Sequence, residues 1–397
     1  VPYWVKEPKG STCNCIYHSQ AHLIISCYRH VMIEAHKNCA CDCEFCGGGA
    51  KCAAELDVLS SQSIFEGALC PREEAETGGE HHKAKCVRRT CASCGPSASA
   101  LFPLLQLTKC PLANSPATAK YKIITTEKKT VSTVDDEGFQ ESKDVSTTIK
   151  KSVESSHAEF TQLLEEHLVG YSAHRHVANF QAEQFDAMVD RLKDTPGHCI
   201  MLMDYGMNYS HVHPDETQGE FWTHVQTTVL PIVVYRLIGG RVWAESYVFL
   251  SDDLKHDNDF VRHCVGVLVK NMKDDGVAVD TIHFWSDGCA CQFKLKKEMF
   301  FVSQPEIFLP DGAKHTVVMS HHFFCSCHGK GPSDAETAVT KSLGRGMENH
   351  GTYMAYPIDF FEGVKQKLEG LSEPKLTAKH RHSLKKRRVL FVERSSV

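Results

Sequence analysis

The chain has 397 residues, of which 42% are hydrophobic and 23% are charged. This composition indicates a globular protein, and the length suits two or three domains. A formal net charge of -5 argues against a general binder of polyanions. No apolar run approaches the roughly 18 residues of a membrane-spanning helix, so we expect no membrane partner.

The first part of the chain is rich in cysteine, with 13 of the 19 cysteines at or before Cys110. Their spacings are short, as in "CACDCEFC", and closely spaced thiolates converge readily on one Zn²⁺ ion. Such an ion replaces a core that a small module cannot build, and we predict a structural zinc module over residues 1–112. A disulfide framework is the alternative, and spacing alone does not group the ligands by ion. The predicted zinc ligands are Cys39, Cys41, Cys43, Cys46, Cys86, Cys91 and Cys94.

Residues 113–195 combine two β-prone runs with a helical stretch. The runs "KYKIITTEKK" and "KDVSTTIKKSV" flank "DDEG", which predicts a hairpin, with a flexible linker as the alternative. Between Ser155 and Lys193 apolar residues recur at steps of three and four, which predicts two amphipathic helices. We expect this region to bind DNA or to connect its neighbours.

Residues 196–348 alternate buried strands with helices. "CIMLMDY" predicts a strand that ends at an acid, and "TTVLPIVVYRL" and "RVWAESYVFL" predict a hairpin through Gly239 and Gly240. A helix, the strand "DTIHFWSD", a second helix, the strand "KHTVVMSHHFFCSC" and the helix "DAETAVTKSLGRGM" follow. A three-strand meander followed by helix, strand, helix, strand and helix is the order of an α/β ribonuclease H-like core. We place that core at residues 196–348 and a C-terminal segment with a basic tail at residues 349–397.

Two acids stand at the ends of predicted strands. Asp204 ends the first strand and Asp287 the fourth, and these strands are neighbours in the predicted order. A third acid from the last helix completes a set of oxygen ligands for two Mg²⁺ or Mn²⁺ ions. Asp334 and Glu336 compete for that place, since on a helix they point about 200° apart. The stretch from Ser333 to Glu336 fits a capping box, which accounts for Glu336 and leaves Asp334 as the predicted ligand.

Three ordered blocks resemble a family of metazoan transposon-derived proteins. They are "DYGMNYS" at Asp204, "SDGCACQFK" at Ser286 and "HGKGPSD" at His328, and the likeness covers about residues 174–341. That family looks like DDE-type transposases with a ribonuclease H-like core. The resemblance implies phosphodiester hydrolysis and strand transfer by Asp204, Asp287 and Asp334 with two Mg²⁺ or Mn²⁺ ions, and we expect His328 to position a water or a phosphate.

The sequence departs from this family at two places. Met207 stands where the family usually has Glu, and residues 335–338 replace a glycine-rich continuation. A domesticated transposase, a catalytically inactive zinc scaffold that binds DNA or protein, and a ribonuclease H-like nuclease therefore stand beside an active transposase.

A basic run from Lys379, "KHRHSLKKRR", suits phosphate contacts or a nuclear address, with a solvated tail as the alternative. We expect DNA as the partner, a homo-oligomer on transposon ends, and a nuclear location. The predicted phosphate contacts are Lys294, Lys330, Lys341, Lys385, Lys386, Arg387 and Arg388.

Overall fold

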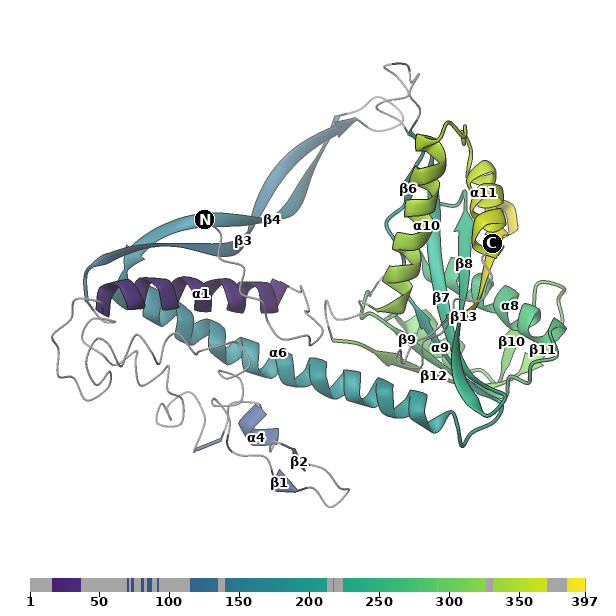
Figure 1. Cartoon of the computed structure of the whole chain (residues 1–397), viewed down its shortest axis with the longest axis horizontal. Coiled ribbons are helices and arrows are strands. Elements are labelled where there is room, and N and C mark those ends of the chain that lie inside the picture. The colour runs from purple at the N-terminus through teal and green to yellow at the C-terminus, as the bar shows by residue number, and fades with distance from the viewer. Residues whose placement is uncertain are drawn as a thin grey trace. The chain divides into compact units, whose positions relative to one another are not determined.

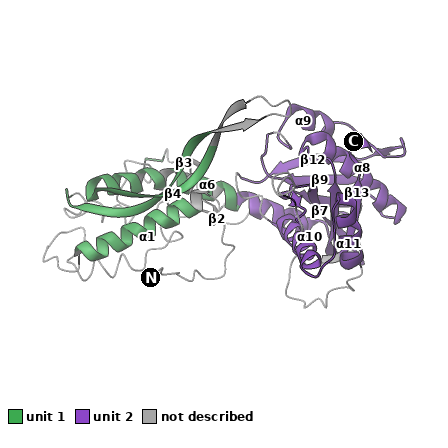
Figure 2. Ribbon diagram, turned by 90° about the horizontal axis from the view of Figure 1, so that it is seen from above, with its two compact units in different colours: residues 1–179 green, residues 180–397 purple. Residues whose placement is uncertain are grey.

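A computed structural model describes residues 16–36, 70, 73–74, 80–81, 84–87, 91–92, 115–134, 140–212, 217, 224–290, 292–325, 331–369 and 384–396. The chain divides into two compact units, residues 1–179 and residues 180–397 (Figure 2). The boundary falls within the region predicted to connect the cysteine-rich module to the α/β core.

The first unit is built on helices and a long hairpin. Helix α1 (Ile16–His36) and the first part of α6 (His157–Arg191) accompany strands β3 (Thr118–Val134) and β4 (Gln140–Ser156) (Figure 1). The two strands pair antiparallel along their whole length, which confirms the predicted hairpin. The prediction of two helices in the following stretch is wrong, because α6 is one helix of 35 residues. Its sequence contains no proline, and its one glycine, Gly170, costs a helix only about 1 kcal/mol relative to alanine.

Aromatic rings form the centre of the first unit's core. The ring of Phe160 on α6 stacks on Tyr121 of β3 with centroids 3.8 Å apart, and it meets Tyr28 of α1 edge-on at 5.5 Å. The buried Cys86 belongs to this core. The first unit also contains three short elements, β1 (Glu73–Glu74), β2 (Glu80–His81) and α4 (Ala84–Val87), the last of which carries Cys86.

The second unit is a mixed sheet covered by helices on both faces, which confirms the predicted α/β class. The order of its strands is β12-β9-β5-β7-β8-β13, with β6 paired to β7. β5, β7 and β8 form the predicted antiparallel meander, whereas β9, β12 and β13 join by parallel pairing. The strands are β5 (His198–Met203), β6 (Tyr209–Ser210), β7 (Gln226–Ile238), β8 (Arg241–Ser251), β9 (Thr281–Ser286), β12 (Val318–Phe323) and β13 (Leu384–Val392).

Side chains alternate between the two faces of the sheet along each strand, so an apolar layer forms on each face. On one face, residues such as Met201, Ile232 and Phe284 pack with α8 (Asn258–Asp274). On the other face, Leu202 and Trp285 pack with the last turns of α6. Helices α10 (Pro332–Asn349) and α11 (Pro357–Glu369) lie side by side and cover the rest of that face, against β7, β8 and β13 (Figure 1).

Several smaller elements complete the second unit. The helix expected within residues 291–304 is the short α9 (Lys296–Val302). The long strand expected over residues 314–327 is divided, with β11 (Lys314–Thr316) pairing to β10 (Glu306–Phe308) and β12 joining the main sheet. The alternative of a solvated basic tail is wrong for residues 384–392, because they form β13 beside β8, ahead of a 3-10 turn (Arg394–Ser396).

Candidate functional site

Asp204 and Asp287 come to matching positions on adjacent strands. β5 pairs in parallel with β9, with residues in register up to Leu202 and Trp285. Each aspartate lies two residues beyond this last pair, so both carboxylates leave the same edge of the sheet, and both are half-buried. The structure thus brings together the two acids that the sequence placed at strand ends.

Helix α10 is held against the loop that follows Asp204. The Ser333 hydroxyl donates to the Leu202 carbonyl at 3.1 Å. Lys341 Nζ donates to the carbonyls of Met207 and Asn208, each at 3.2 Å. Gly206 permits this approach, because a Cβ there would lie 2.5 Å from Thr337 Cγ2. These contacts fix the start of α10, which carries Asp334, beside the strand end that carries Asp204.

Asp334, and not Glu336, makes the capping hydrogen bond at the start of α10. The prediction that Glu336 caps the helix is wrong: Asp334 Oδ2 accepts from the Gly331 backbone N–H at 3.0 Å. Glu336 is 2% exposed and accepts two hydrogen bonds from Arg387, at 2.8 and 3.0 Å. The helix begins two residues earlier than predicted, with Pro332, so Asp334 and not Glu336 occupies its first turn.

The three aspartates act on one another electrostatically. Burial, followed by the negative charges of Asp287 and Asp334, raises the pKa of Asp204 to about 7. Asp287 Oδ1 accepts from the Cys289 backbone N–H at 3.0 Å. Within the described ranges the three carboxylates do not form a group with all ligand atoms inside 4.8 Å, a criterion that only a cysteine cluster meets. Together the three acids make a region of negative charge in which Asp204 resists ionisation.

The loop after Asp204 is braced by polar groups that sequence reasoning passed over. The Tyr205 ring stacks on His256 with centroids 4.5 Å apart, and its hydroxyl donates to the Asp257 carbonyl at 3.0 Å. His256 Nε2 lies 2.7 Å from Asn208 Oδ1. The signal was present, since "DYGMNYS" and "SDDLKHD" both belong to the region that resembles transposon-derived proteins, but only a structure shows that they touch.

A series of buried hydrogen-bonded side chains connects Glu298 to Asp287. His321 Nδ1 on β12 lies 2.8 Å from Glu298 Oε1 on α9, and His321 Nε2 lies 2.9 Å from Ser286 Oγ. The same serine hydroxyl donates to the Asp287 carbonyl at 2.9 Å. Glu298 also accepts from Asn258 Nδ2 at 2.7 Å. These hydrogen bonds therefore join α8, α9 and β12 to Asp287.

The predicted phosphate contacts are mostly engaged within the second unit. Lys341 is bound to the loop carbonyls described above, and Lys294 Nζ lies 5.7 Å from the Phe323 ring centroid. Lys386 lies 3.5 Å from Asp275, and Arg388 pairs with the same carboxylate. Their binding to phosphate stays a prediction, as does that of Arg387. His328 and Lys330 lie outside the described residues, and so does the side chain of Lys385.

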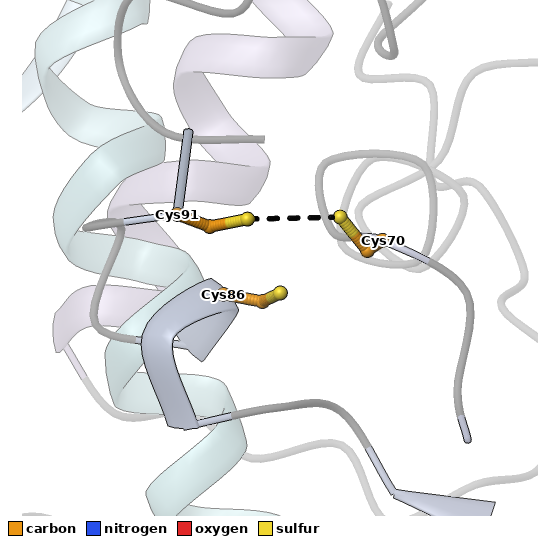
Figure 3. A group of neighbouring side chains, drawn as sticks. All are labelled: Cys70, Cys86 and Cys91. Atoms are coloured by element: carbon orange, nitrogen blue, oxygen red, sulfur yellow. Dashed lines mark hydrogen bonds between the residues drawn. The ribbon is translucent and has the colours of Figure 1, made fainter. Parts of the chain in front are cut away.

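A separate cluster in the first unit gathers three cysteine sulfurs. The Sγ atoms of Cys70, Cys86 and Cys91 all lie within 4.8 Å of one another, and those of Cys70 and Cys91 are 3.9 Å apart (Figure 3). Cys86 and Cys91 were predicted metal ligands. Cys70 was missed, because it has no cysteine within a few residues and spacing gave no signal. The other predicted zinc ligands lie outside the described residues.

Comparison with known proteins gives a family model and distant matches among solved structures. The sequence model of a family described as "Domain of unknown function (DUF8701)" matches residues 181–390. No curated protein matches the chain. A cryo-EM structure of the simian T-cell lymphotropic virus intasome in complex with PP2A regulatory subunit B56 gamma aligns at 11% identity with a TM-score of 0.27. The alignment covers 47% of this chain and 53% of that one, and a TM-score this low assigns neither fold nor function.

Proposed function

Because the chain belongs to a family described only as a domain of unknown function (DUF8701), we propose its activity from its own residues: the second unit is a DDE-type transposase core, active or domesticated, that cuts and joins DNA. The observation that carries the proposal is the matched position of Asp204 and Asp287 at the ends of paired strands. Asp334 supplies the third acid from the helix fixed beside them.

The topology of the sheet supports a ribonuclease H-like core. In such a core the first strand lies between the second and the fourth, and the third and fifth lie outside them. Taking β5, β7, β8, β9 and β12 as strands one to five, the observed order β12-β9-β5-β7-β8 has this arrangement. The expected orientations are also present, with an antiparallel meander and parallel pairing of the later strands.

The carboxylates fit a site for hard divalent cations. All three offer oxygen ligands, which Mg²⁺ and Mn²⁺ prefer. The pKa of Asp204 is raised by burial and by the charges of the other two acids, so a cation there relieves a repulsion that the fold maintains. Asp204, Asp287 and Asp334 would hold the ions. When bound, a pair of such ions activates a water and stabilises the leaving oxygen at phosphorus.

The chain's own groups hold this site in place. The buried chain through Ser286 and His321 fixes the end of β9, and the bonds from Ser333 and Lys341 fix α10 against the loop after Asp204. Such positioning matters because catalysis at phosphorus depends on in-line placement of the attacking and leaving oxygens.

One observation favours the non-catalytic scaffold as the second candidate. Met207, at the position where transposon-derived proteins usually have Glu, is 82% exposed. An apolar side chain so open to solvent gives the site no further carboxylate. It also gives the protein a contact point for a partner.

The test is Mn²⁺-dependent nicking and strand transfer on supercoiled plasmid by the full chain, beside Asp204→Asn, Asp287→Asn and Asp334→Asn. Each substitution removes a ligand charge, and we expect losses larger than the ~10–100-fold typical of groups around a metal site. Asp311→Asn is the matched control, because Asp311 lies on an exposed turn of the same unit and pairs with Lys270. It should retain wild-type activity.

A thermal-shift measurement separates loss of chemistry from loss of folding. Mn²⁺ should raise the melting temperature of the wild type and of Asp311→Asn, and raise that of the three site variants less. A folded wild type that is stabilised by Mn²⁺ yet acts on neither plasmid DNA nor an RNA–DNA hybrid would refute the enzymatic proposal and favour the scaffold.

A further inference from the structure

We propose that Cys70, Cys86 and Cys91 are three ligands of a structural Zn²⁺ ion in the first unit. The three sulfur atoms face one another (Figure 3), and all lie within 4.8 Å of each other. The proposal rests on these sulfurs alone. It stands or falls independently of the acids in the second unit.

The spacing of the sulfurs matches metal ligation better than a covalent bridge. A Zn–S bond is about 2.3 Å, so tetrahedral ligation places two sulfurs about 3.8 Å apart. Cys70 and Cys91 have their sulfurs 3.9 Å apart. A disulfide would require about 2.05 Å, and these two residues are not bonded to one another.

The donor set also selects the ion. Three thiolates form a soft ligand set, which favours Zn²⁺ over the Mg²⁺ or Mn²⁺ proposed for the carboxylates. Because all three sulfurs surround one small volume, the site holds a single ion. A Zn²⁺ ion bound by thiolates is also inert to redox chemistry, which suits a structural role.

The surroundings explain what the ion would stabilise. Cys86 lies on the four-residue helix α4 and is 1% exposed, in the core formed by α1, β3 and α6. Cys70 and Cys91 pack against the same core. The described elements nearby, β1 and β2, have two residues each. Elements this short form few backbone hydrogen bonds. Metal ligation stabilises the fold of many small modules of this kind.

The first experiment measures zinc in the full chain, expressed in zinc-supplemented medium and purified under reducing conditions. We expect Cys70→Ser, Cys86→Ser and Cys91→Ser each to lose one zinc per chain relative to the wild type, with a lower melting temperature. Cys27→Ser is the matched control, because Cys27 on α1 is half-buried against the same core and lies outside the cluster. It should keep the wild-type zinc content.

A second experiment needs no variant and remains decisive if the serine variants do not fold. The wild type is treated with iodoacetamide before and after chelation, and the alkylated cysteines are identified by peptide mass spectrometry. We expect Cys70, Cys86 and Cys91 to be protected together and to become reactive together when zinc is removed. Reconstitution with Co²⁺ should give a thiolate-to-metal charge-transfer band.

Two results would overturn the proposal. One is full zinc content in all three serine variants. The other is a wild type whose three cysteines react with iodoacetamide equally well with and without the chelator, or appear as disulfides in the non-reduced protein. Loss of plasmid cleavage in the aspartate variants, with zinc retained, would leave this site intact and bear only on the second unit.

Discussion

His321 Nδ1 lies 2.8 Å from Glu298 Oε1 in the second unit, and the two side chains are only 1% and 2% exposed. The opposite nitrogen of the same ring lies 2.9 Å from Ser286 Oγ, whose hydroxyl donates to the Asp287 carbonyl. The two ring nitrogens and the serine hydroxyl therefore form one continuous series of buried polar contacts. This buried series of contacts ends at the backbone carbonyl of Asp287, whose carboxylate belongs to the proposed active site.

The first prediction concerns Glu298→Gln, which keeps the side chain's shape and removes its charge. Glu298 accepts from His321 and Asn258 in a buried setting, so the change should lower the free energy of unfolding by about 1–3 kcal/mol. If the chain positions Asp287, turnover should also fall by ~10–100-fold in variant protein that is fully folded at the assay temperature. Chemical denaturation and plasmid nicking provide the two readouts.

The control for this variant is Glu306→Gln. Glu306 pairs with Lys314 at 2.9 Å, but the two side chains are 38% and 55% exposed. Exposed pairs contribute about 0–1 kcal/mol, so this change should alter stability little and turnover not at all. Equal stability of the Glu298 and Glu306 variants would show that the buried hydrogen bonds of Glu298 contribute no more to the free energy of unfolding than an exposed ion pair does.

The second prediction is that Asp204→Asn stabilises the metal-free protein. The pKa of Asp204 is raised to about 7, first by burial and then by Asp287 and Asp334. A raised pKa in the folded state means that stability is lost as pH rises from the unfolded value near 4 through 7. The neutral Asn does not ionise, so its advantage in melting temperature should be small at pH 5 and larger at pH 8.

At pH 8, Mn²⁺ should make the wild type more stable than Asp204→Asn. The ion stabilises the wild type, whereas the variant lacks one of its ligands and gains less from it. Asp311→Asn should change with pH as the wild type does between pH 5 and pH 8, and should respond to the ion as the wild type does. An Asp204→Asn protein that is less stable than the wild type in metal-free buffer at pH 8 would show that no charge repulsion is stored at the site.

The third prediction separates a structural from a DNA-binding role for Arg387. Its guanidinium makes two hydrogen bonds to the buried Glu336, which join β13 to α10. Arg387→Met leaves that carboxylate buried without its partner and should cost about 3 kcal/mol of stability. The exposed Lys314→Met should cost far less.

Measurements of DNA affinity against salt concentration decide the second half of this prediction. Each phosphate contact contributes roughly one unit to the slope of log affinity against log salt. If Arg387 is occupied by Glu336, the slope for folded Arg387→Met should equal that of the wild type. A slope reduced by about one would establish Arg387 as a phosphate contact, as its place in the basic run first indicated.

The strands of the sheet were predictable because their sequences carry their own signals. The apolar run before Asp204 and the Gly239-Gly240 turn each specify a local structure, and the position of the two acids follows from them. β13 was not predictable, because four basic residues dominate the appearance of a segment that pairs through its backbone. Arg387 pairs with Glu336 and Arg388 with Asp275, and both acids lie far away in sequence.

The same limit applies at the two candidate sites. The cysteine spacing indicated Cys86 and Cys91, but Cys70 joins them only through the folding of the intervening chain. The capping assignment failed by two residues, because Pro332 starts the helix and Asp334 therefore occupies the position that bonds back to Gly331. Local patterns predict which residues are available. Tertiary contacts decide which of them meet.

The last prediction concerns a histidine chain on the sheet, where His198 Nδ1 on β5 lies 3.3 Å from His283 Nε2 on β9. His283 Nδ1 lies 2.8 Å from Ser320 Oγ on β12, which in turn lies 3.0 Å from His322 Nε2. Burial, followed by the charges of His198 and His322, lowers the pKa of His283 to about 4. The folded protein therefore holds this ring neutral.

Between pH 6.5 and about 4 the unfolded chain binds a proton at His283 that the folded chain resists, so stability should fall as pH falls through this window. His283→Gln cannot take up that proton, and its stability should fall less steeply over the same range. Denaturant unfolding of the two proteins at pH 7, 6 and 5, followed by tryptophan fluorescence, measures the difference in stability. Parallel pH profiles for the two proteins would show that the neutral ring is not maintained at the expense of folding stability.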